Sequence, residues 1–281
     1  MTVRLLTLGD EPVLEAFLGA HRDSSMIPRA NIRRVGIVYE GQAFGGQYVG
    51  AFRDGAIVAF AGHSWNGVLI VQATEQVAEV TRACVAISGR KVTGILGPLE
   101  HVIEARAALG LAEVPAKKDE DEALCALDLD ELCIPQSLAT GAIVCRPPVP
   151  EEREQLYAWR VAYNLEILGG VDSADLRRQS ASMIDWQIND GLAWVALENG
   201  KLVSFSGYNS ALPDIVQLGG IYTPPEHRAR GHARAAIAAQ LLASRRAGVE
   251  RAVLFASDPF AMRCYEGLGF RQIGEFGLVL W

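Results

Sequence analysis

The stretch that decides the fold is PPEHRARGHARAAIAAQLL, residues 224–242. Its first half is rich in arginine and histidine, and its second half is an alanine-rich run typical of an α-helix. Backbone N–H groups at a helix start have no intrahelical acceptor, and the helix dipole adds partial positive charge there. Gly231 lets a ligand approach the backbone without meeting a Cβ atom. Residues 228–234, called the basic loop below, therefore predict a binding site for an anion such as a diphosphate.

The overall charge of the chain makes this loop unusual. The 281 residues carry a formal net charge of −7, so an anionic ligand needs a local basic patch. The acidic balance also argues against nucleic acid as the main partner. A hydrophobic content of 50% indicates a globular protein with a large core. Because no apolar run is long enough for a membrane span and the first residues lack a signal-peptide pattern, we expect a cytoplasmic protein without membrane contact.

The spacing of cysteine and histidine predicts neither disulfides nor a metal site. The five cysteines form no C-x-x-C pair, and the five histidines show no spacing typical of metal ligands. We therefore expect mostly buried free thiols and no metal. Cys264 lies on an apolar helical stripe and is interpreted as a core residue rather than a nucleophile.

Two segments follow spacing patterns of a known family. The diphosphate motifs G-x-x-x-x-G-K-[ST] and G-x-G-x-x-G are both absent. The basic loop instead fills the pattern R/Q-x-x-G-x-G/A with Arg228, Gly231 and Ala233. The later segment SDPFAMRCYEGLGF follows N-x-x-A-x-x-x-Y-x-x-x-G-F, with Asp258 in place of asparagine and Tyr265 at the tyrosine position. Together they resemble the GNAT superfamily of acyl-CoA-dependent N-acetyltransferases.

The resemblance implies a cofactor site and a catalytic residue. In that family the loop amides bind the pyrophosphate of coenzyme A, and the preceding strand lies beside its pantetheine arm. Tyr265 would donate a hydrogen bond to the leaving thiol. The cofactor-binding residues implied in this way are Ile221, Tyr222, Thr223, Arg228, Ala229, Arg230, Gly231, His232, Ala233, Arg234 and Asp258.

The implied reaction is direct attack of an amine on the thioester of acetyl-CoA. An alkylammonium with a pKa of about 10 is almost fully protonated at neutral pH, so a base or a chain of waters is needed. Glu166 and Asp172 flank a connection between two expected helices that lines the acceptor side in the family, and they are our candidates for substrate binding or base. A surface role for both carboxylates is an equal alternative. His227 and Asp214 are further candidates for the base.

A repeat divides the chain into two related halves. Residues 54–72 and 199–217 align without a gap at an offset of 145, and each copy resembles a β-hairpin. The segments 90–111 and 250–270 align at an offset of 161, so the second copy has gained 16 residues, the difference between the two offsets. The gained residues include the basic loop. Because the first copy lacks this loop, we expect it to bind no coenzyme A.

The expected fold class is α/β, with two tandem GNAT-like units that are each a mixed, mostly antiparallel sheet flanked by helices. The expected domains are a degenerate unit at 1–130, a proline-rich linker and entry strand at 131–149, and a catalytic unit at 150–281. In the second unit the patterns predict strands at about 142–146, 192–198, 201–208, 214–223, 250–257, 270–274 and 276–281.

The sequence therefore predicts an N-acetyltransferase that uses acetyl-CoA to acetylate an amine of a small molecule or a protein. Another acyl-CoA donor and a hydroxyl acceptor are alternatives within the same chemistry. A non-catalytic sensor of acyl-CoA is the alternative from a different class. The oligomeric state stays open between a monomer and a homodimer.

Overall fold

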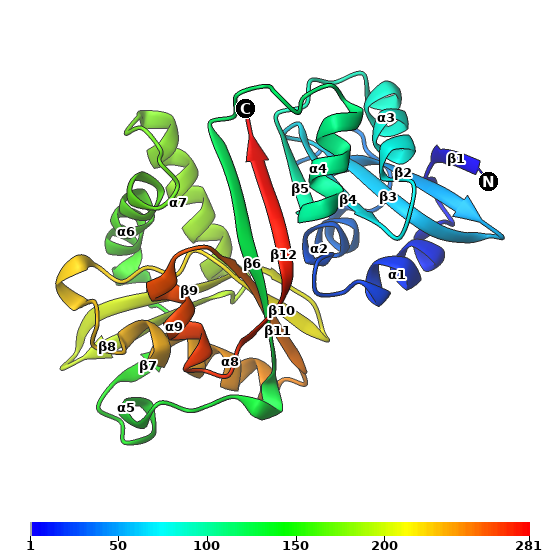
Figure 1. The fold of residues 1–281 in the computed structure, drawn as a ribbon. Helices are drawn as coiled ribbons and strands as arrows, with labels where there is room; N and C mark the ends of the chain where they lie inside the picture. Colours follow the sequence, from blue (N-terminus) through cyan, green and yellow to red (C-terminus); the bar gives the residue numbers. More distant parts are fainter. Residues whose placement is uncertain (1) are drawn as a thin grey trace. The chain divides into compact units, whose positions relative to one another are not determined.

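The computed structural model describes residues 2–281, and the chain divides into two compact units. Unit 1 comprises the described residues up to Leu124 together with Phe255–Ser257 and Gln272–Trp281, and unit 2 comprises Cys125–Leu254 and Asp258–Arg271. Each unit is a mixed sheet with helices packed on it, as the sequence predicts (Figure 1). Most strand pairs are antiparallel, and each unit also has a parallel pair in its sheet.

Unit 1 begins with one strand and two helices before its long hairpin. Its strands follow the spatial order β1-β2-β3-β4-β5-β12. Its elements are β1 (Thr2–Leu5), α1 (Glu11–Ala20), α2 (Met26–Val35), β2 (Gly46–Arg53), β3 (Ala56–Ser64), β4 (Val68–Ala73), α3 (Val77–Ser88), β5 (Gly94–Pro98), α4 (Leu99–Ala108), the first part of β6 (Lys118–Asp128) and β12 (Arg271–Leu280).

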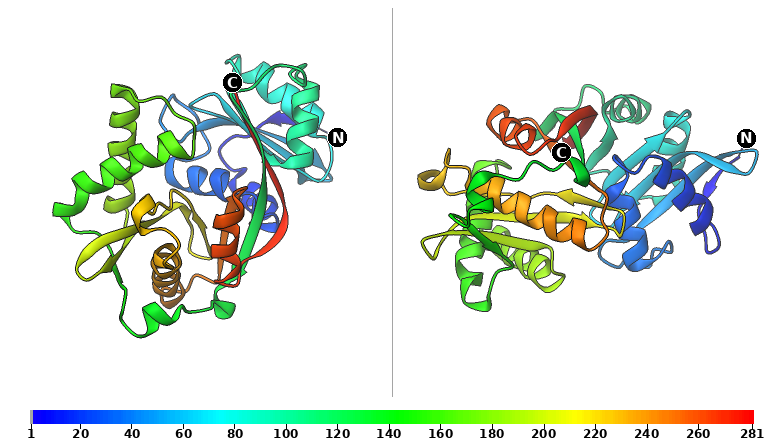
Figure 2. Two further views of the ribbon diagram at one scale, coloured as in Figure 1. Left: turned by 60° about the vertical axis from the view of Figure 1, so that its left-hand side comes forward. Right: turned by 90° about the horizontal axis from the view of Figure 1, so that it is seen from below.

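Side-chain alternation along the strands gives unit 1 a core on each face of its sheet. Phe60 of β3 points to the α1 side, where it packs with Leu14 and Leu18, whereas Ala59 and Ala61 point to the opposite side. The right-hand view of Figure 2 shows α1 and α2 on one side of these strands and α3 and α4 on the other.

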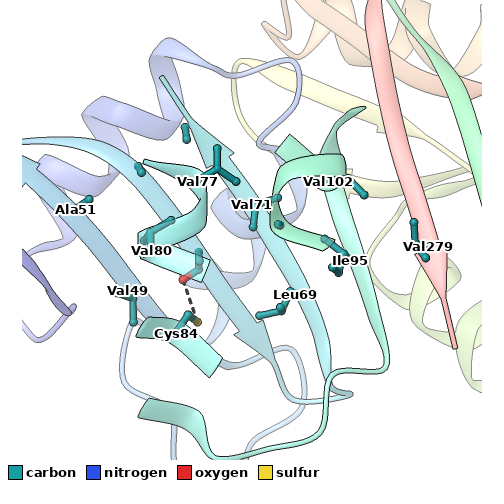
Figure 3. Close-up of a cluster of buried hydrophobic side chains, with 14 residues drawn as sticks. Val49, Ala51, Leu69, Val71, Val77, Val80, Cys84, Ile95, Val102 and Val279 are labelled. Atoms are coloured by element: carbon teal, nitrogen blue, oxygen red, sulfur yellow. Dashed lines mark hydrogen bonds between the residues drawn. The ribbon is translucent and has the colours of Figure 1, made fainter. Parts of the chain in front are cut away.

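The core beneath α3 holds a buried thiol (Figure 3). Cys84 is fully buried, and its Sγ lies 3.4 Å from the carbonyl oxygen of Ala61. Burial raises the pKa of Cys84 to about 12, so its thiol stays protonated and unreactive. Cys125 is also buried, but Cys133 is exposed and Cys145 and Cys264 are partly exposed, so the expectation of mostly buried thiols, with Cys264 in the core, holds only in part.

Unit 2 repeats the same order of elements. Its strands follow the order β11-β10-β9-β8-β7. Its elements are the end of β6, η1 (Leu129–Glu131), α5 (Gln136–Ala139), β7 (Val144–Arg146), η2 (Pro150–Glu152), α6 (Arg153–Glu166), α7 (Ala174–Asn189), β8 (Ala193–Glu198), β9 (Lys201–Ala211), β10 (Ile215–Leu218), η3 (Pro225–His227), α8 (His232–Arg246), most of β11 (Arg251–Ala256) and α9 (Pro259–Glu266).

The helices of unit 2 cover both faces of its sheet. Leu156 of α6 and Ile184 of α7 pack on Val195 of β8, and Ala235 and Ala236 of α8 pack on the other face. Figures 1 and 2 show α6 and α7 together on one side of β8 and β9, with α8 on the other. This packing fixes the start of α8, and with it the basic loop, at the end of β10.

The last strand differs from the expectation. The sequence suggests two short strands at 270–274 and 276–281 within the second domain, but the structure has one strand, β12, which pairs antiparallel with β5 of unit 1 from Phe276↔Pro98 to Leu280↔Gly94. Gly277 fits this place because a Cβ atom there would press on Val102 of α4. The residues expected as a linker belong to unit 2, where they form α5 and β7.

The repeat is also less regular in space than in sequence. In unit 1 Phe60 pairs with Gln72, but in unit 2 Phe205 forms a bridge with Tyr222 and Gln217 pairs with Ser210. The hairpin of unit 2 is therefore longer, and the alignment at offset 145 holds for the first arm only. Among residues 2–281, no helix combines the length and the apolar character needed to cross a membrane.

Candidate active site

The basic loop has an open, anion-binding backbone. Ala229 and Gly231 have φ angles of 60° and 81°, so left-handed residues alternate with ordinary ones. Such alternation turns successive N–H groups toward one concavity. Within residues 2–281, none of the backbone N–H groups of 229–234 has an acceptor, and the first turn of α8 closes only with the bond from Ala235 N to Gly231 O at 3.0 Å. A Cβ atom on Gly231 would meet nothing within 4 Å, so the mouth of this concavity is open.

Arg228 is held by a carboxylate at the edge of the loop. Its Nη1 lies 2.6 Å from Oε1 of Glu166, and its Nε donates to Thr223 O at 2.9 Å. The guanidinium also lies 5.8 Å from the ring centre of Tyr222. The hydrogen bond from Arg228 lowers the pKa of Glu166, which makes its carboxylate a weaker base.

Two other side chains of the loop have structural partners. The His232 side chain is buried, with Nδ1 2.9 Å from His227 O and Nε2 3.4 Å from Glu198. Its imidazole therefore points into the core, and only its backbone N–H is left to bind an anion. The guanidinium of Arg234 packs against Gly267, whereas Arg230 is exposed.

The strand before the loop breaks where a thioester is expected. Pairing of β10 with β11 ends at Gln217↔Val253, and β10 itself ends at Leu218 instead of continuing to residue 223. Tyr222 N donates to Phe205 O at 3.1 Å and Gly219 N to Gly207 O, but the N–H groups of Gly220, Ile221 and Thr223 have no acceptor within the described chain. These free amides can stabilise negative charge on an oxygen atom.

Tyr265 presents an uncommitted hydroxyl group. It lies on α9, whose start is capped by Asp258, with Oδ2 accepting from Ala261 N at 2.8 Å. Its ring packs edge-on to Phe270 at 6.1 Å, and among residues 2–281 its hydroxyl has no hydrogen-bond partner. Burial raises the pKa of Tyr265 above its usual value, so the hydroxyl stays protonated and able to donate. Because Oδ2 of Asp258 accepts this hydrogen bond from Ala261 N, only the other carboxylate oxygen is left for a ligand.

The structure leaves neither predicted acceptor-side carboxylate unpaired. Glu166 binds Arg228, and Asp172 binds Arg177 through two hydrogen bonds. Asp214 precedes β10, whereas the break follows it, and a strand of four residues spans about 13 Å, so Asp214 lies at the wrong end for a base. His227 lies near the loop, with its ring 5.9 Å from that of His232.

Two residues of α6 were missed by the sequence reasoning. Arg160 presses on the backbone of Gly220, where a Cβ atom would collide with Nη1, and its guanidinium lies 4.8 Å from the ring centre of Tyr163. Tyr163 in turn interacts electrostatically with Tyr265. In the sequence, Arg160 directly follows Trp159 of the apolar stripe of this helix. This position next to the stripe could have indicated an arginine at the edge of the core.

Unit 1 has no comparable anion site. Only residues 74–76 separate β4 from α3, and the N–H of Ala78 in the first turn donates to Oε1 of Glu104 at 3.2 Å. The unit thus places its own carboxylate at the helix start. Gly97 of β5 packs directly on the carbonyl oxygen of Val71, so β4 and β5 stay together where β10 and β11 separate.

The described part of the chain contains no group of three or more histidine, cysteine, aspartate or glutamate residues able to hold a metal ion. The candidate site is therefore built from backbone amides, arginines and a tyrosine. These groups suit a phosphorylated acyl donor.

Comparisons with known proteins identify this architecture. Residues 153–270 match the model of the acetyltransferase (GNAT) family. No curated protein matches the chain. The solved structures with a similar fold include two GCN5-related N-acetyltransferases. That of Sphaerobacter thermophilus has a TM-score of 0.60 and 17% identity, and 99% of this chain aligns with 94% of it. That of Kribbella flavida has the same score and identity, with 93% and 95% covered.

A tandem GNAT protein from the clavulanic acid biosynthesis pathway is also similar in fold. Its TM-score is 0.57 at 13% identity, and 99% of this chain aligns with 97% of that one. This match over the whole length confirms the two-unit form predicted from the repeat.

Proposed function

We propose that this chain, a member of the GNAT superfamily of acetyltransferases, transfers an acetyl group from acetyl-CoA to an amine. The row of unpaired amides at residues 229–234 is the observation that carries the proposal. These amides can bind paired phosphates, and they lie in the unit that matches the family model. In unit 1 the corresponding helix start is occupied by the carboxylate of Glu104. Since acetyl-CoA is the donor, we propose that the reaction takes place in the cytoplasm.

The residues of unit 2 fit coenzyme A. The amides of the basic loop would bind the pyrophosphate, with Arg228 and Arg230 at its edge, and the free N–H groups of Gly220, Ile221 and Thr223 would lie along the pantetheine arm. When bound, acetyl-CoA supplies an activated thioester carbonyl. His232 and Ala233 contribute through their backbone, and Asp258 through the start of α9.

Two groups of the chain stabilise the transfer. The free N–H groups near Gly220 would hold the carbonyl oxygen as it gains negative charge. The hydroxyl of Tyr265 would donate a hydrogen bond to the sulfur as its bond to carbon breaks. The raised pKa of Tyr265 keeps this donor protonated in the neutral to moderately alkaline range, where the amine begins to lose its proton.

Deprotonation of the amine is coupled to donor binding in this proposal. While Arg228 pairs with Glu166, the carboxylate is a poor base. A pyrophosphate that draws Arg228 toward the loop would release Glu166, and its pKa would rise toward the usual value. The free carboxylate can then accept a proton from the incoming ammonium directly or through water, so we propose that acetyl-CoA binds before the amine.

A thiol-release assay tests the proposal. The chain is mixed with acetyl-CoA and a panel of amines, amino acids, aminoglycosides and peptides, and free coenzyme A is measured. Amine-dependent release supports the acetyltransferase. Release with a longer acyl-CoA or an alcohol alone would assign another acyl transfer, and tight binding of acetyl-CoA without turnover on any acceptor would identify a sensor.

A further inference from the structure

The guanidinium of Arg160 is a positive charge without a partner inside unit 2. Its Nε is buried and has no hydrogen bond, and among residues 2–281 the side chain forms no ion pair with a carboxylate. The guanidinium lies 4.8 Å from the centre of the Tyr163 ring. Burial lowers the pKa of Arg160, as expected for a cation shielded from water.

Another arginine of α6 has the partners expected of an arginine with a purely structural role. One face of α6 carries Arg153, which pairs with Asp185 and donates to Asn189 at 3.0 Å. A buried cation that lacks such partners costs stability, because its lost hydration is not replaced. A cost of this kind is expected where a ligand completes the site.

Arg160 lies at the point of acyl transfer. Its Nη1 packs on Gly220, which has a φ of 71° and one of the free amides proposed to hold the thioester oxygen. An anion bound to Arg160 would therefore lie beside Gly220, where the thioester oxygen is proposed to bind.

The missing partner is a carboxylate on the acceptor. A guanidinium presents a planar fork that fits the two oxygens of a carboxylate, and a single positive charge balances a single negative one. A phosphate dianion would need a second cation, but Arg228 pairs with Glu166 in the free chain and turns to the pyrophosphate in the proposed complex. We infer that the acceptor is a small amine that bears a carboxylate, bound through Arg160, so that its amine reaches the carbonyl held near Gly220. This inference rests on the proposed function and names its substrate class.

The test compares acids with their amides. The acetylation of glycine, L-alanine, β-alanine and L-glutamate is measured beside glycinamide, L-alaninamide, β-alaninamide, ethylamine and O-phosphoethanolamine. The amine of an amino-acid amide is less basic than that of its parent acid, so more of it is deprotonated at neutral pH. A preference for the acid therefore requires recognition of the carboxylate. The expected kcat/KM ratio of acid to amide is about 100 or more for the preferred pair.

Substitutions of Arg160 test whether this side chain causes the preference for the acid. In Arg160→Met, the ratio of kcat/KM for the acid to kcat/KM for the amide falls about 100-fold to near one, and any loss caused by the changed packing on Gly220 is common to both substrates and cancels in this ratio. Arg160→Lys keeps the charge without the fork and loses about ten-fold. Arg178→Met removes an exposed arginine and serves as the matched control. Because Met removes an unpaired charge that is half-buried, Arg160→Met keeps or raises the Tm, whereas a purely structural role would lower it.

The possible results distinguish a failure of the carboxylate site at Arg160 from a failure of the proposed acetyltransferase function. Equal use of acids and amides, or a preference for the phosphate, would overturn the role of Arg160 while leaving the acetyltransferase intact. No turnover on any amine would overturn the proposed function. In that case calorimetry with the amino acids and the chain saturated with coenzyme A decides: binding that is lost in Arg160→Met supports the carboxylate site, and no binding contradicts it.

Discussion

The carboxylate of Glu166 lies 2.6 Å from the guanidinium of Arg228, so the basic loop already holds an anion of the chain itself. A pyrophosphate has to compete with this carboxylate for Arg228. Glu166 belongs to the end of α6 and Arg228 to the loop before α8, and the ion pair therefore connects the acceptor side of the site with the donor side.

Glu166→Gln should bind acetyl-CoA more tightly. The substitution removes the competing charge, and an exposed ion pair contributes about 0.2–1 kcal/mol, so we expect a gain of up to about five-fold in affinity. Turnover should fall in the same variant if Glu166 accepts the proton. Isothermal calorimetry measures the first effect, with Glu154→Gln, an exposed glutamate of α6, as control. Weaker binding in Glu166→Gln would contradict the competition.

Gly231→Val should abolish binding of coenzyme A. The valine side chain would fill the open mouth of the loop, and its backbone is strained at a φ of 81°. Gly248→Val is the matched control because Gly248 is also exposed, with a φ of 95° and open space around it, but lies outside the loop. Both variants should lose a similar amount of stability in thermal unfolding. Only Gly231→Val should lose affinity, by about 100-fold or more, and equal affinities would refute the phosphate site.

Tyr265→Phe should lower kcat at least ten-fold and leave the Kd for acetyl-CoA nearly unchanged. The phenyl ring keeps the packing against Phe270, and only the hydroxyl proposed to bind the leaving sulfur is lost. Tyr157→Phe, which removes a hydroxyl bonded to Asp185 at 2.6 Å, is the control and should keep its turnover. Unchanged kcat in Tyr265→Phe would exclude this tyrosine from the mechanism.

The pH profile follows from the state of the same tyrosine. A hydrogen-bond donor is active below its pKa and is lost above it, and the pKa of Tyr265 is raised beyond the usual value of about 10. The rate should therefore rise with pH as the amine and its base lose their protons and show no decline below about pH 10. A descending limb between pH 7 and 9 that disappears in Tyr265→Phe would contradict the raised pKa.

One coenzyme A should bind per chain. In unit 1 the carboxylate of Glu104 accepts from the start of α3, and the contact of Gly97 with Val71 keeps β4 and β5 together. Calorimetric titration should give a stoichiometry of one, and Gly231→Val should remove that single event. A second binding event that survives this substitution would place a site in unit 1.

Local signals made the second unit predictable. Ser173 accepts from Leu176 N at 3.1 Å and Asp258 caps α9, so residues next to each helix set where it begins. The family and the two-unit fold were predictable for the same reason. The loop motif and the hairpins each depend on residues that lie close together in the sequence. The candidate site residues themselves stay predictions that the variants above address.

Long-range pairings account for what the sequence did not predict. Nothing in residues 271–280 indicates that they pair with β5 in unit 1 rather than with a strand closer in sequence, since their alternation fits any sheet edge. The burial of His232 depends on Glu198 and His227 O, and the unpaired Nε of Arg160 depends on which distant residues of the described chain fold around it. Such relations appear only when distant elements are brought together.

The most direct test of the phosphate site is an amide ¹H–¹⁵N titration of the full chain with coenzyme A, followed by inorganic pyrophosphate. If the loop binds the pyrophosphate, we expect saturable downfield shifts of the N–H resonances of Gly231, His232 and Ala233, because these groups gain hydrogen-bond acceptors only when the ligand binds. Shifts confined to other parts of the chain, with these three resonances unmoved at saturation, would contradict it.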